Sequence, residues 1–545
     1  MKHPKAERVA AGPEPAPPVS LAGLNYAEAL RLHWIGQIDR AEPLYRAALA
    51  LEPGHADAHY NLGLIYHSQN KLAEAVVEFR EAVFARADFA EAYSNLATVI
   101  KAQGMPENAL VLYRQALMLA PQNGMTHSNV GLLLNEMGRS AEAVKAFRTA
   151  IALAPDYQWA YLNFAPALLE LGQHEDSLAA CRRGIAANPM AALAHHNLGA
   201  TFKTMNRIPE SIACFRHALT LDANFAEAHF ALGQLLLMHG EFEEGWKEYD
   251  WRWKLQEYGW LRNIHGEFSK PRWAGEDLTG KTILIYAEQG LGDALQYVRY
   301  IPRVLAKGGR VILAVHPPLI PLFAGIPGVE VVALDQVPWP EFDFHCPLLT
   351  LPMLFKTDAQ SIPAEIPYLF ADPDRVKRWK GRIGGKGLKV GLVWAGNPIQ
   401  RGDKMRSPGL KSVRPLFDVE GVQFVALQVG PGRKDLEGAP LPPAVLDLGP
   451  EIKDFADTAA IMKELDLMIS SCTAPLHLAG ALGVPTWGLI PFAPHLLWQL
   501  DRSDSPWYPS LRLYRQDAPG MDWSGVVGRM AADLADLVKR KANGL

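Results

Sequence analysis

The chain has 545 residues, which is more than one hydrophobic core organises, so we expect two or three domains. The 54 basic and 58 acidic residues give a formal net charge of −4, which offers no electrostatic reason to expect nucleic acid as the main partner. The four cysteines are scattered and form no CxxC pair, which argues against a disulfide framework or a cysteine zinc site.

Residues 1–22 contain charges and several prolines but no apolar core. This composition predicts a disordered tail rather than a signal peptide. The longest apolar stretch, residues 311–326, contains a histidine and three prolines and so predicts no membrane span. We therefore expect a cytoplasmic protein.

Residues 23–262 are built from blocks that repeat at a regular interval. Successive blocks open with DAHYNLGLIY, EAYSNLATVI and MTHSNVGLLL, and a small residue and then an aromatic one recur later in the block, as at Ala75 and Phe79. Each block holds two apolar stretches of helical period around a polar or glycine-containing turn. The pattern resembles the tetratricopeptide repeat, and about seven copies predict a right-handed solenoid with a long concave face, in which the aromatic residue fills the gap to the next repeat.

One column of this repeat is asparagine. An asparagine amide both donates and accepts hydrogen bonds, so an inward-facing row of them would pair with the backbone of an extended acceptor peptide. Alternatively, the asparagines serve neighbouring helices within the solenoid, and the sequence leaves both interpretations open. The column consists of Asn61, Asn95, Asn129, Asn163 and Asn197.

Beyond the repeats we expect a linker at residues 263–280, docked on the protein because Trp273 is costly to leave in water. Short apolar runs rich in β-branched residues then alternate with helical patterns, which is typical of buried parallel strands. The pattern predicts an α/β region with a lobe at 281–371, a hinge at 372–388 and a second lobe, with a final helix, at 389–545. The expected strands are TILIYAE, RVILAVH, VEVVAL and FDFHCPLL, then VGLVWAG, FVALQVG, LDLMISS and PTWGLIP.

Ligands of parallel sheets bind beyond the carboxyl ends of the strands, which directs attention to three loops. The first, AEQGLGD, follows the strand at 282–286. Gly290 and Gly292 permit close backbone approach there. Asp293 is either the N-cap of the next helix or a carboxylate that faces the cleft.

The second loop is WAGNPIQRGDKMRS, residues 394–407. It brings Asn397 together with Arg401, Lys404 and Arg406 directly after a buried strand. Such a cluster is either a solvated loop or a phosphate clamp.

The third loop begins SSCTAPLH at residue 470. Ser471 and Thr473 precede a helix that begins near Pro475, and His477 lies in its first turn. Hydroxyl residues and proline are ordinary at a helix start, but the same arrangement also describes an anion site. By itself, a histidine at such a position is more often structural than functional.

GLGDALQYVRYIP, VWAGNP and SCTAPLHLAGALGVPTWGLIP resemble segments of heptosyltransferase-like glycosyltransferases of family 9. The coupling to tetratricopeptide repeats resembles bacterial proteins similar to O-linked N-acetylglucosamine transferases. The resemblance implies a GT-B fold of two Rossmann-like lobes, a nucleotide-sugar donor as substrate and no cofactor or metal. It also implies that Asp293 is the catalytic base. The residues that it implies for the donor are Gly290, Gly292, Asn397, Lys404, Arg406, Ser471, Thr473 and His477.

Two details bear on that resemblance. The clear Asp-x-Asp pair, Asp372 and Asp374, precedes a helix and is better explained as a cap than as a metal site. Relatives often carry aspartate before the hydroxyl of the donor segment, where this chain has Cys472, followed by Thr473. This departure implies a changed donor or a weakened activity.

We expect a transferase that moves a sugar to a serine or threonine of a protein held by the solenoid. By resemblance the acceptor is a flagellin-like surface protein. One alternative is a non-catalytic adaptor whose α/β half is degenerate. Another is a transferase that acts on a lipid-linked glycan, which a long concave solenoid suits less well. The sequence identifies neither the sugar nor the nucleotide.

Overall fold

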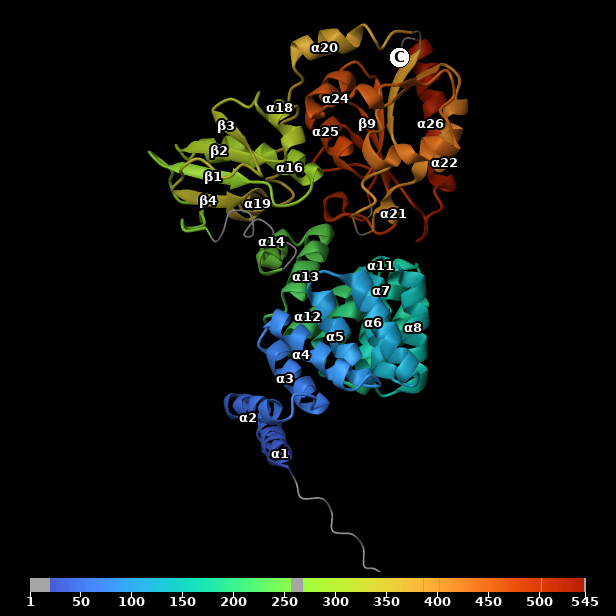
Figure 1. Cartoon of the computed structure of the whole chain (residues 1–545). Coiled ribbons are helices and arrows are strands. Elements are labelled where there is room, and N and C mark those ends of the chain that lie inside the picture. The colour runs from blue at the N-terminus through green and yellow to red at the C-terminus, as the bar shows by residue number, and fades with distance from the viewer. Residues whose placement is uncertain (1–19, 256–267, 386, 401, 501, 544–545) are drawn as a thin grey trace, which may run out of the picture. The chain divides into compact units, whose positions relative to one another are not determined.

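The computed structural model describes residues 20–255, 268–385, 387–400, 402–500 and 502–543 (Figure 1). Most of the predicted tail, the first part of the predicted linker and Arg401 lie outside the described residues. The chain divides into two compact units, one that ends at Asn188 and one that runs from Pro189 to Leu545. No helix in the described ranges is both long and apolar enough to cross a membrane.

Residues 21–249 form seven pairs of helices, as the repeat pattern predicts. In the first unit they are α1 (Leu21–Trp34), α2 (Ile38–Leu51), α3 (Ala56–Ser68), α4 (Leu72–Ala85), α5 (Ala90–Ala102), α6 (Pro106–Leu119), α7 (Gly124–Glu136), α8 (Ser140–Leu153), α9 (Gln158–Glu170) and α10 (His174–Ala187). The second unit opens with α11 (Ala192–Thr204), α12 (Ile208–Leu221), α13 (Ala226–His239) and α14 (Phe242–Tyr249).

The first helix of every pair ends in the same way. A residue with positive φ follows it once in each repeat, and this residue is always glycine or asparagine. Only these residue types enter the left-handed region at low cost, so they end one helix and turn the chain into the next. The turn residues are Gly36, Asn70, Gly104, Gly138, Gly172, Asn206 and Gly240.

The aromatic side chain of the second helix packs within its own pair. A Cβ atom at Gly63 of α3 would lie 2.8 Å from the ring of Phe79 in α4, and one at Gly131 would lie equally close to Phe147. Both rings are fully buried. The sequence pattern predicts that the ring fills the gap to the next repeat, and Phe147 does lie 6.0 Å, between ring centroids, from Phe164 of the next pair. The structure adds that a glycine on the first helix of the same pair receives the ring.

Residues 282–515 contain two parallel sheets. The first, in the order β3-β2-β1-β4, consists of β1 (Thr282–Tyr286), β2 (Arg310–Val315), β3 (Val329–Ala333) and β4 (Phe344–Pro347). The second, in the order β10-β9-β8-β5-β6-β7, consists of β5 (Leu388–Val393), β6 (Val422–Ala426), β7 (Leu446–Asp447), β8 (Leu467–Ser471), β9 (Thr486–Ile490) and β10 (Leu511–Arg515). The sequence analysis missed β7, which has two residues, and β10, which carries two arginines.

Helices lie between these strands along the chain, and a last one follows β10 (Figure 1). Those of the first lobe are α16 (Leu291–Tyr297), α17 (Ile301–Leu305), α18 (Ile320–Phe323) and α19 (Leu351–Leu354). Those that follow are α20 (Pro373–Lys380), α21 (Asp403–Arg406), α22 (Gly409–Val413), α23 (Asp435–Gly438), α24 (Phe455–Met462), α25 (Ala474–Leu482) and α26 (Ser524–Ala542).

The described part of the linker, residues 268–280, docks on the first sheet. Trp273 is 1% exposed, its backbone N–H donates to His345 O over 2.8 Å, and its indole N–H donates to Glu276 O over 3.0 Å. The expectation of a docked tryptophan is therefore confirmed.

The segment between the sheets contains α20. Asp372 caps this helix by accepting from the N–H groups of Asp374 and Arg375, so the cap explanation of the Asp-x-Asp pair is confirmed. Arg375 and Trp379 both donate to the buried carboxylate of Asp457 in α24. This segment is therefore held against the second lobe.

The strand order places two switch points. In the first sheet, β2 and β3 lie on one side of β1 and β4 lies on the other, so the strand order changes side between β1 and β4. In the second sheet the same change occurs between β5 and β8. Crevices for ligands form at the carboxyl ends of the strands at such points. The loops after β1, β5 and β8 are the three that the sequence analysis selected.

Candidate active site

Asp293 lies in the first turn of α16, just beyond β1. Gly290 is the N-cap of this helix and has an extended conformation, with φ of −69° and ψ of 169°. Asp293 is the third helical residue, and its Oδ2 accepts from the Gly290 N–H over 3.1 Å. Of the two alternatives for Asp293, the N-cap is therefore wrong, because glycine occupies that position and the carboxylate reaches back to it.

The side chain of Asp293 is a weaker acid than an ordinary aspartate, because its pKa is raised. Burial, and behind it the negative charge of Glu288, raises the pKa of Asp293 from 3.8 to about 6. The Gly290 N–H and the charge of Arg406 act in the opposite direction. The residue is nevertheless partly exposed. A partly accessible carboxylate with a pKa near neutrality is suited to accept a proton.

Glu288 is part of a buried ion-pair network. Arg252, in the 3-10 helix η1 (Asp250–Lys254) after α14, donates to Glu288 Oε1 over 2.7 Å, and the two side chains are 1% and 0% exposed. Leu349 N–H also donates to Oε1, over 3.3 Å. Burial raises the pKa of Glu288 despite the opposing charge of Arg252. The end of the repeat region is thus tied to the loops after β1 and β4.

The loop after β5 holds Arg406 in place. Its Nε donates to Asp403 Oδ1 over 3.0 Å, and another guanidinium nitrogen donates to Gln400 Oε1. Ser407 Oγ donates to Asp403 Oδ2 over 3.0 Å and accepts from Gly396 N–H over 2.9 Å. Arg406 is partly exposed, so a fixed guanidinium remains accessible to an anion.

The other residues expected in this loop lie differently. Asn397 is exposed, and its Oδ1 accepts from the backbone N–H of Ile399. Lys404 is also exposed, and no hydrogen bond or ion pair of its side chain forms within the described residues.

Thr473 is the N-cap of α25, beyond β8. Its Oγ1 lies 3.3 Å from Ser471 Oγ, and Ser471 itself is fully buried. Cys472, between them, accepts through Sγ from the indole N–H of Trp498 over 2.9 Å, and its carbonyl oxygen lies 3.4 Å from Arg406 Nη1. Burial raises the pKa of the Cys472 thiol, which therefore stays neutral.

His477 is buried in the first turn of α25. Its Nδ1 hydrogen-bonds to Tyr508 Oη over 3.1 Å, and its ring stacks on Trp498 with centroids 5.3 Å apart. Burial, followed by the charges of His495 and Arg299, lowers the pKa of His477 to about 3. The imidazole is therefore neutral at pH 7.

The helices α16 and α25 meet at this point. A Cβ at Gly292 would lie 2.9 Å from His477 Cδ2, so only glycine fits there. A Cβ at Gly290 would lie 3.7 Å from Gln400 Nε2. Arg299, after α16, donates to Trp507 O over 2.9 Å and stacks over the Tyr508 ring. The predicted residues Gly290, Gly292, Asp293, Arg406, Thr473 and His477 therefore lie around one contact between the lobes.

The asparagine column makes bonds within the solenoid. Asn61 Nδ2 donates to Tyr26 Oη over 3.4 Å and to Asp57 O over 2.8 Å. Asn95 Nδ2 makes the equivalent bonds to Tyr60 Oη, over 2.9 Å, and to Glu91 O. Both donors thus link one helix pair to the preceding pair. Asn197 is buried, and Asn129 and Asn163 are partly exposed.

Sequence patterns missed several groups around Asp293. Glu288 is two residues before Gly290, but a buried glutamate has no local signature. Gln400 lies in the second loop, but nothing in the sequence marks its bond to Arg406. Tyr508 reaches the site through its hydrogen bond to His477, 31 residues away, which no spacing rule predicts. Within the described residues, no cluster of three or more His, Cys, Asp or Glu side chains is arranged to hold a metal ion.

Comparison with known families identifies the repeats. Tetratricopeptide-repeat models match residues 26–88 and 196–250, residues 134–199 and residues 90–123, so the chain contains a tetratricopeptide-repeat solenoid, which ends at about residue 250 and precedes the α/β region. Protein FlbA of Caulobacter vibrioides is 30% identical over 334 residues, which cover 55% of this chain and 54% of FlbA. The chain thus spans about half the length of this curated relative.

Solved repeat structures also resemble part of the chain. A tetratricopeptide repeat protein from Parabacteroides merdae is 19% identical, with a TM-score of 0.38 over 43% of this chain and 93% of its own. PilW, described as a type IV pilus biogenesis factor, is 20% identical, with a TM-score of 0.34 over 37% and 92%. YrrB, described as having an unusual peptide-binding site, is 20% identical, with a TM-score of 0.29 over 34% and 95%.

Proposed function

We propose that the α/β region is a glycosyltransferase with two Rossmann-like lobes in a GT-B arrangement, which moves a sugar from a nucleotide-sugar donor to a protein hydroxyl. One observation carries the proposal: a partly exposed carboxylate with a pKa near 6, Asp293, lies where the strand-end loops of both lobes meet. Enzymes place perturbed titratable groups in such positions.

In the proposed reaction Asp293 removes the proton from a serine or threonine hydroxyl. The acceptor oxygen then bonds to the anomeric carbon, and the bond from that carbon to the donor phosphate breaks. The leaving nucleotide takes the electron pair and its negative charge. At pH 7 most Asp293 side chains are ionised and ready to act as the base.

The loops after β5 and β8 are suited to the donor. Arg406 is held by Asp403 and Gln400, and this fixed positive charge would stabilise the diphosphate as it leaves. Thr473, at the start of α25, would add a hydroxyl and a helix N-terminus. His477 is neutral and would act through hydrogen bonding rather than charge.

Cys472 fits this assignment. In place of the carboxylate of relatives, the chain has a thiol that is neutral and bonded to Trp498. We therefore interpret the departure from relatives as a change in donor contacts that leaves the base intact.

The solenoid would recruit the protein acceptor, which we propose to be a flagellin-like surface protein. The Oδ1 atoms of Asn61 and Asn95 would accept from the acceptor backbone while their Nδ2 atoms hold the repeats together. The two interpretations of the asparagine column are then compatible.

The test is a donor screen by calorimetry followed by mass spectrometry of the acceptor. We expect the wild type to bind one nucleotide sugar and to add its sugar mass to a protein. Binding without transfer by Asp293→Asn would support the assignment. Failure of the wild type to bind any nucleotide sugar would leave the α/β half as a scaffold and the protein as an adaptor.

A further inference from the structure

A column of arginines runs along the second helices of the repeats. It recurs once in each repeat, directly after the buried aromatic position, and all of its members are exposed. The members are Arg46, Arg80, Arg114, Arg148, Arg182 and Arg216.

A second column lies in the first turn of the second helix of the following repeat and is acidic with one exception. Its members are Glu74, Asn108, Glu142, Asp176, Glu210 and Glu244. Arg148 pairs with Asp176 over 3.6 Å, and Arg216 pairs with Glu244 over 3.0 Å. The spacing thus places an arginine beside the acid of the next repeat.

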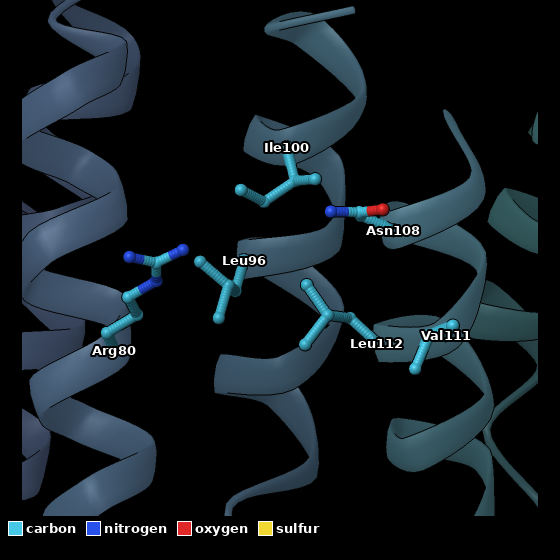
Figure 2. A pocket seen from close by; sticks show the side chains of 6 residues that line it. All are labelled: Arg80, Leu96, Ile100, Asn108, Val111 and Leu112. Carbon is cyan, nitrogen blue, oxygen red and sulfur yellow. The ribbon is translucent and has the colours of Figure 1, made fainter. Parts of the chain in front are cut away.

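Asn108 breaks this pattern, and a pocket lies at the break. The pocket has a volume of about 400 Å³ and opens between α4 and α6 over α5. Figure 2 shows the Arg80 side chain on one wall and Asn108 on the opposite wall. Leu96 and Ile100 form the floor, and Val111 and Leu112 complete the lining.

In the acidic column, the residue opposite Arg80 is Asn108, so Arg80 has no carboxylate partner there. Within the described residues its side chain forms no ion pair or hydrogen bond, and Asn108 offers only a neutral amide. A guanidinium binds carboxylates in a bidentate geometry, so a free one marks a site for an external acid. The missing ion pair would have contributed little to folding, since exposed pairs are weak.

The surface around the pocket is apolar. Val77 and Phe84 lie three residues before and four residues after Arg80, on the same face of α4, and Phe84 is 87% exposed. Val111 and Met118 form a matching pair on α6, exposed by 64% and 77%. Apolar side chains gathered in this way around a cavity are typical of an interaction surface.

We propose that this surface, defined by Arg80, Asn108 and the exposed apolar residues of α4 and α6, binds an acidic segment of another protein. The segment would insert an apolar side chain over Leu96 and Ile100 and supply the carboxylate that Asn108 lacks. The proposal concerns the repeats alone and does not depend on the transferase.

The positive charge of Arg80 favours an acidic segment of another protein over the other partners that could cover this surface. A second copy of the chain would present the same exposed arginines, and like charges across an interface are unfavourable. Residues 1–19 of the chain itself carry three Lys or Arg residues against two Glu, so they offer no acidic surplus. The pocket also continues into an open apolar strip along two helices, which suits a peptide segment better than an enclosed small molecule.

The test uses the full chain and two pools of synthetic peptides about 15 residues long, the length at which isolated helices begin to form. One pool places aspartate or glutamate four residues from a leucine or phenylalanine. The other carries asparagine or glutamine at that position. Binding is followed by fluorescence polarisation and by the methyl NMR signal of Ile100. We expect the acidic pool to bind and to shift that signal.

The decisive variant is Asn108→Glu, which restores the acid of the column and pairs Arg80 internally. It should keep the fold and weaken binding of the acidic pool by about tenfold or more, as expected for loss of a charge-assisted contact. Arg148→Gln, in the same column but away from the pocket, should bind like the wild type. Equal binding of both pools, or unchanged binding by Asn108→Glu, would overturn the proposal. So would dimerisation of the wild type that Asn108→Glu abolishes.

Discussion

Polar groups are satisfied in different ways in the repeats and around Asp293. In the repeats one kind of bond recurs along the chain: His59 Nε2 bonds to Pro53 O, and His127 bonds to Pro121 O in the same way. Ion pairs between repeats, such as Arg148 with Asp176, are exposed. Around Asp293 the bonds do not recur and they join buried groups, since Arg252 bonds to Glu288 and to Thr350. Recurring bonds of one kind make a scaffold. Single bonds between buried charges make a site whose groups have altered acidity.

The strongest way to test this contrast is Asp293→Asn. Activity should fall by roughly two to four orders of magnitude, the usual span for a general base, because the amide cannot accept the proton. Asparagine keeps an oxygen for the Gly290 N–H, so the helix start should persist. Turnover with the bound donor measures the effect. Asp372→Asn, which changes a capping aspartate of α20, is the matched control and should retain full activity.

The same variant should differ in stability as a function of pH. The pKa of Asp293 is raised from 3.8 to about 6 on folding, so its contribution to stability is lost as pH rises through that window. Asp293→Asn removes the charge and should melt at a higher temperature than the wild type at pH 8, with little difference near pH 4. A lower melting temperature of the variant at pH 8 would contradict the burial of the charge.

The second test alters the buried ion pair between Glu288 and Arg252 through Glu288→Gln. Removing this negative charge while Arg252 keeps its positive charge favours ionised Asp293. The acid limb of kcat/KM should therefore move to lower pH. The buried guanidinium would lose its buried partner and keep only Asp250, whose Oδ1 lies 3.0 Å away, so the free energy of unfolding should also fall. The pH–rate profile and urea unfolding measure the two effects. If the acid limb stayed at the same pH or moved to higher pH, the charge of Glu288 would not be a cause of the raised pKa of Asp293.

A smaller effect is expected for Arg406→Ala. Loss of a charge-assisted contact should weaken donor binding by roughly 1.5–3 kcal/mol, measured by calorimetry. Lys411→Ala removes an exposed cation of the same lobe and is the control that should bind normally. Equal donor affinity of Arg406→Ala and the wild type would remove Arg406 from the donor site.

The smallest effect belongs to the repeats. Asp176→Asn breaks the exposed pair with Arg148 and should cost at most about 1 kcal/mol in thermal or urea unfolding. The comparison with Glu288→Gln then contrasts an exposed ion pair with a buried one. If Asp176→Asn lowered the free energy of unfolding by several kcal/mol, the exposed pair would contribute as much as the buried one, which contradicts the prediction.

The same contrast explains what the sequence could predict. The repeats are visible because their helices, turns and aromatic positions recur at fixed spacing, down to the left-handed residues such as Gly36 and Asn70. The loops of the site could be located because they follow apolar strands. The role of Asp293 at the third helical position, and the link from Glu288 to Arg252, depend on contacts between distant segments. No periodic signal records such contacts.

Gly292 has a practical consequence for redesign of the contact between the lobes. The absence of a side chain there lets α16 and α25 come together, since a Cβ would lie 2.9 Å from His477 Cδ2. Gly292→Ala would therefore force the His477 ring or one of the two helices to shift. The variant is a means of changing how closely the two lobes approach.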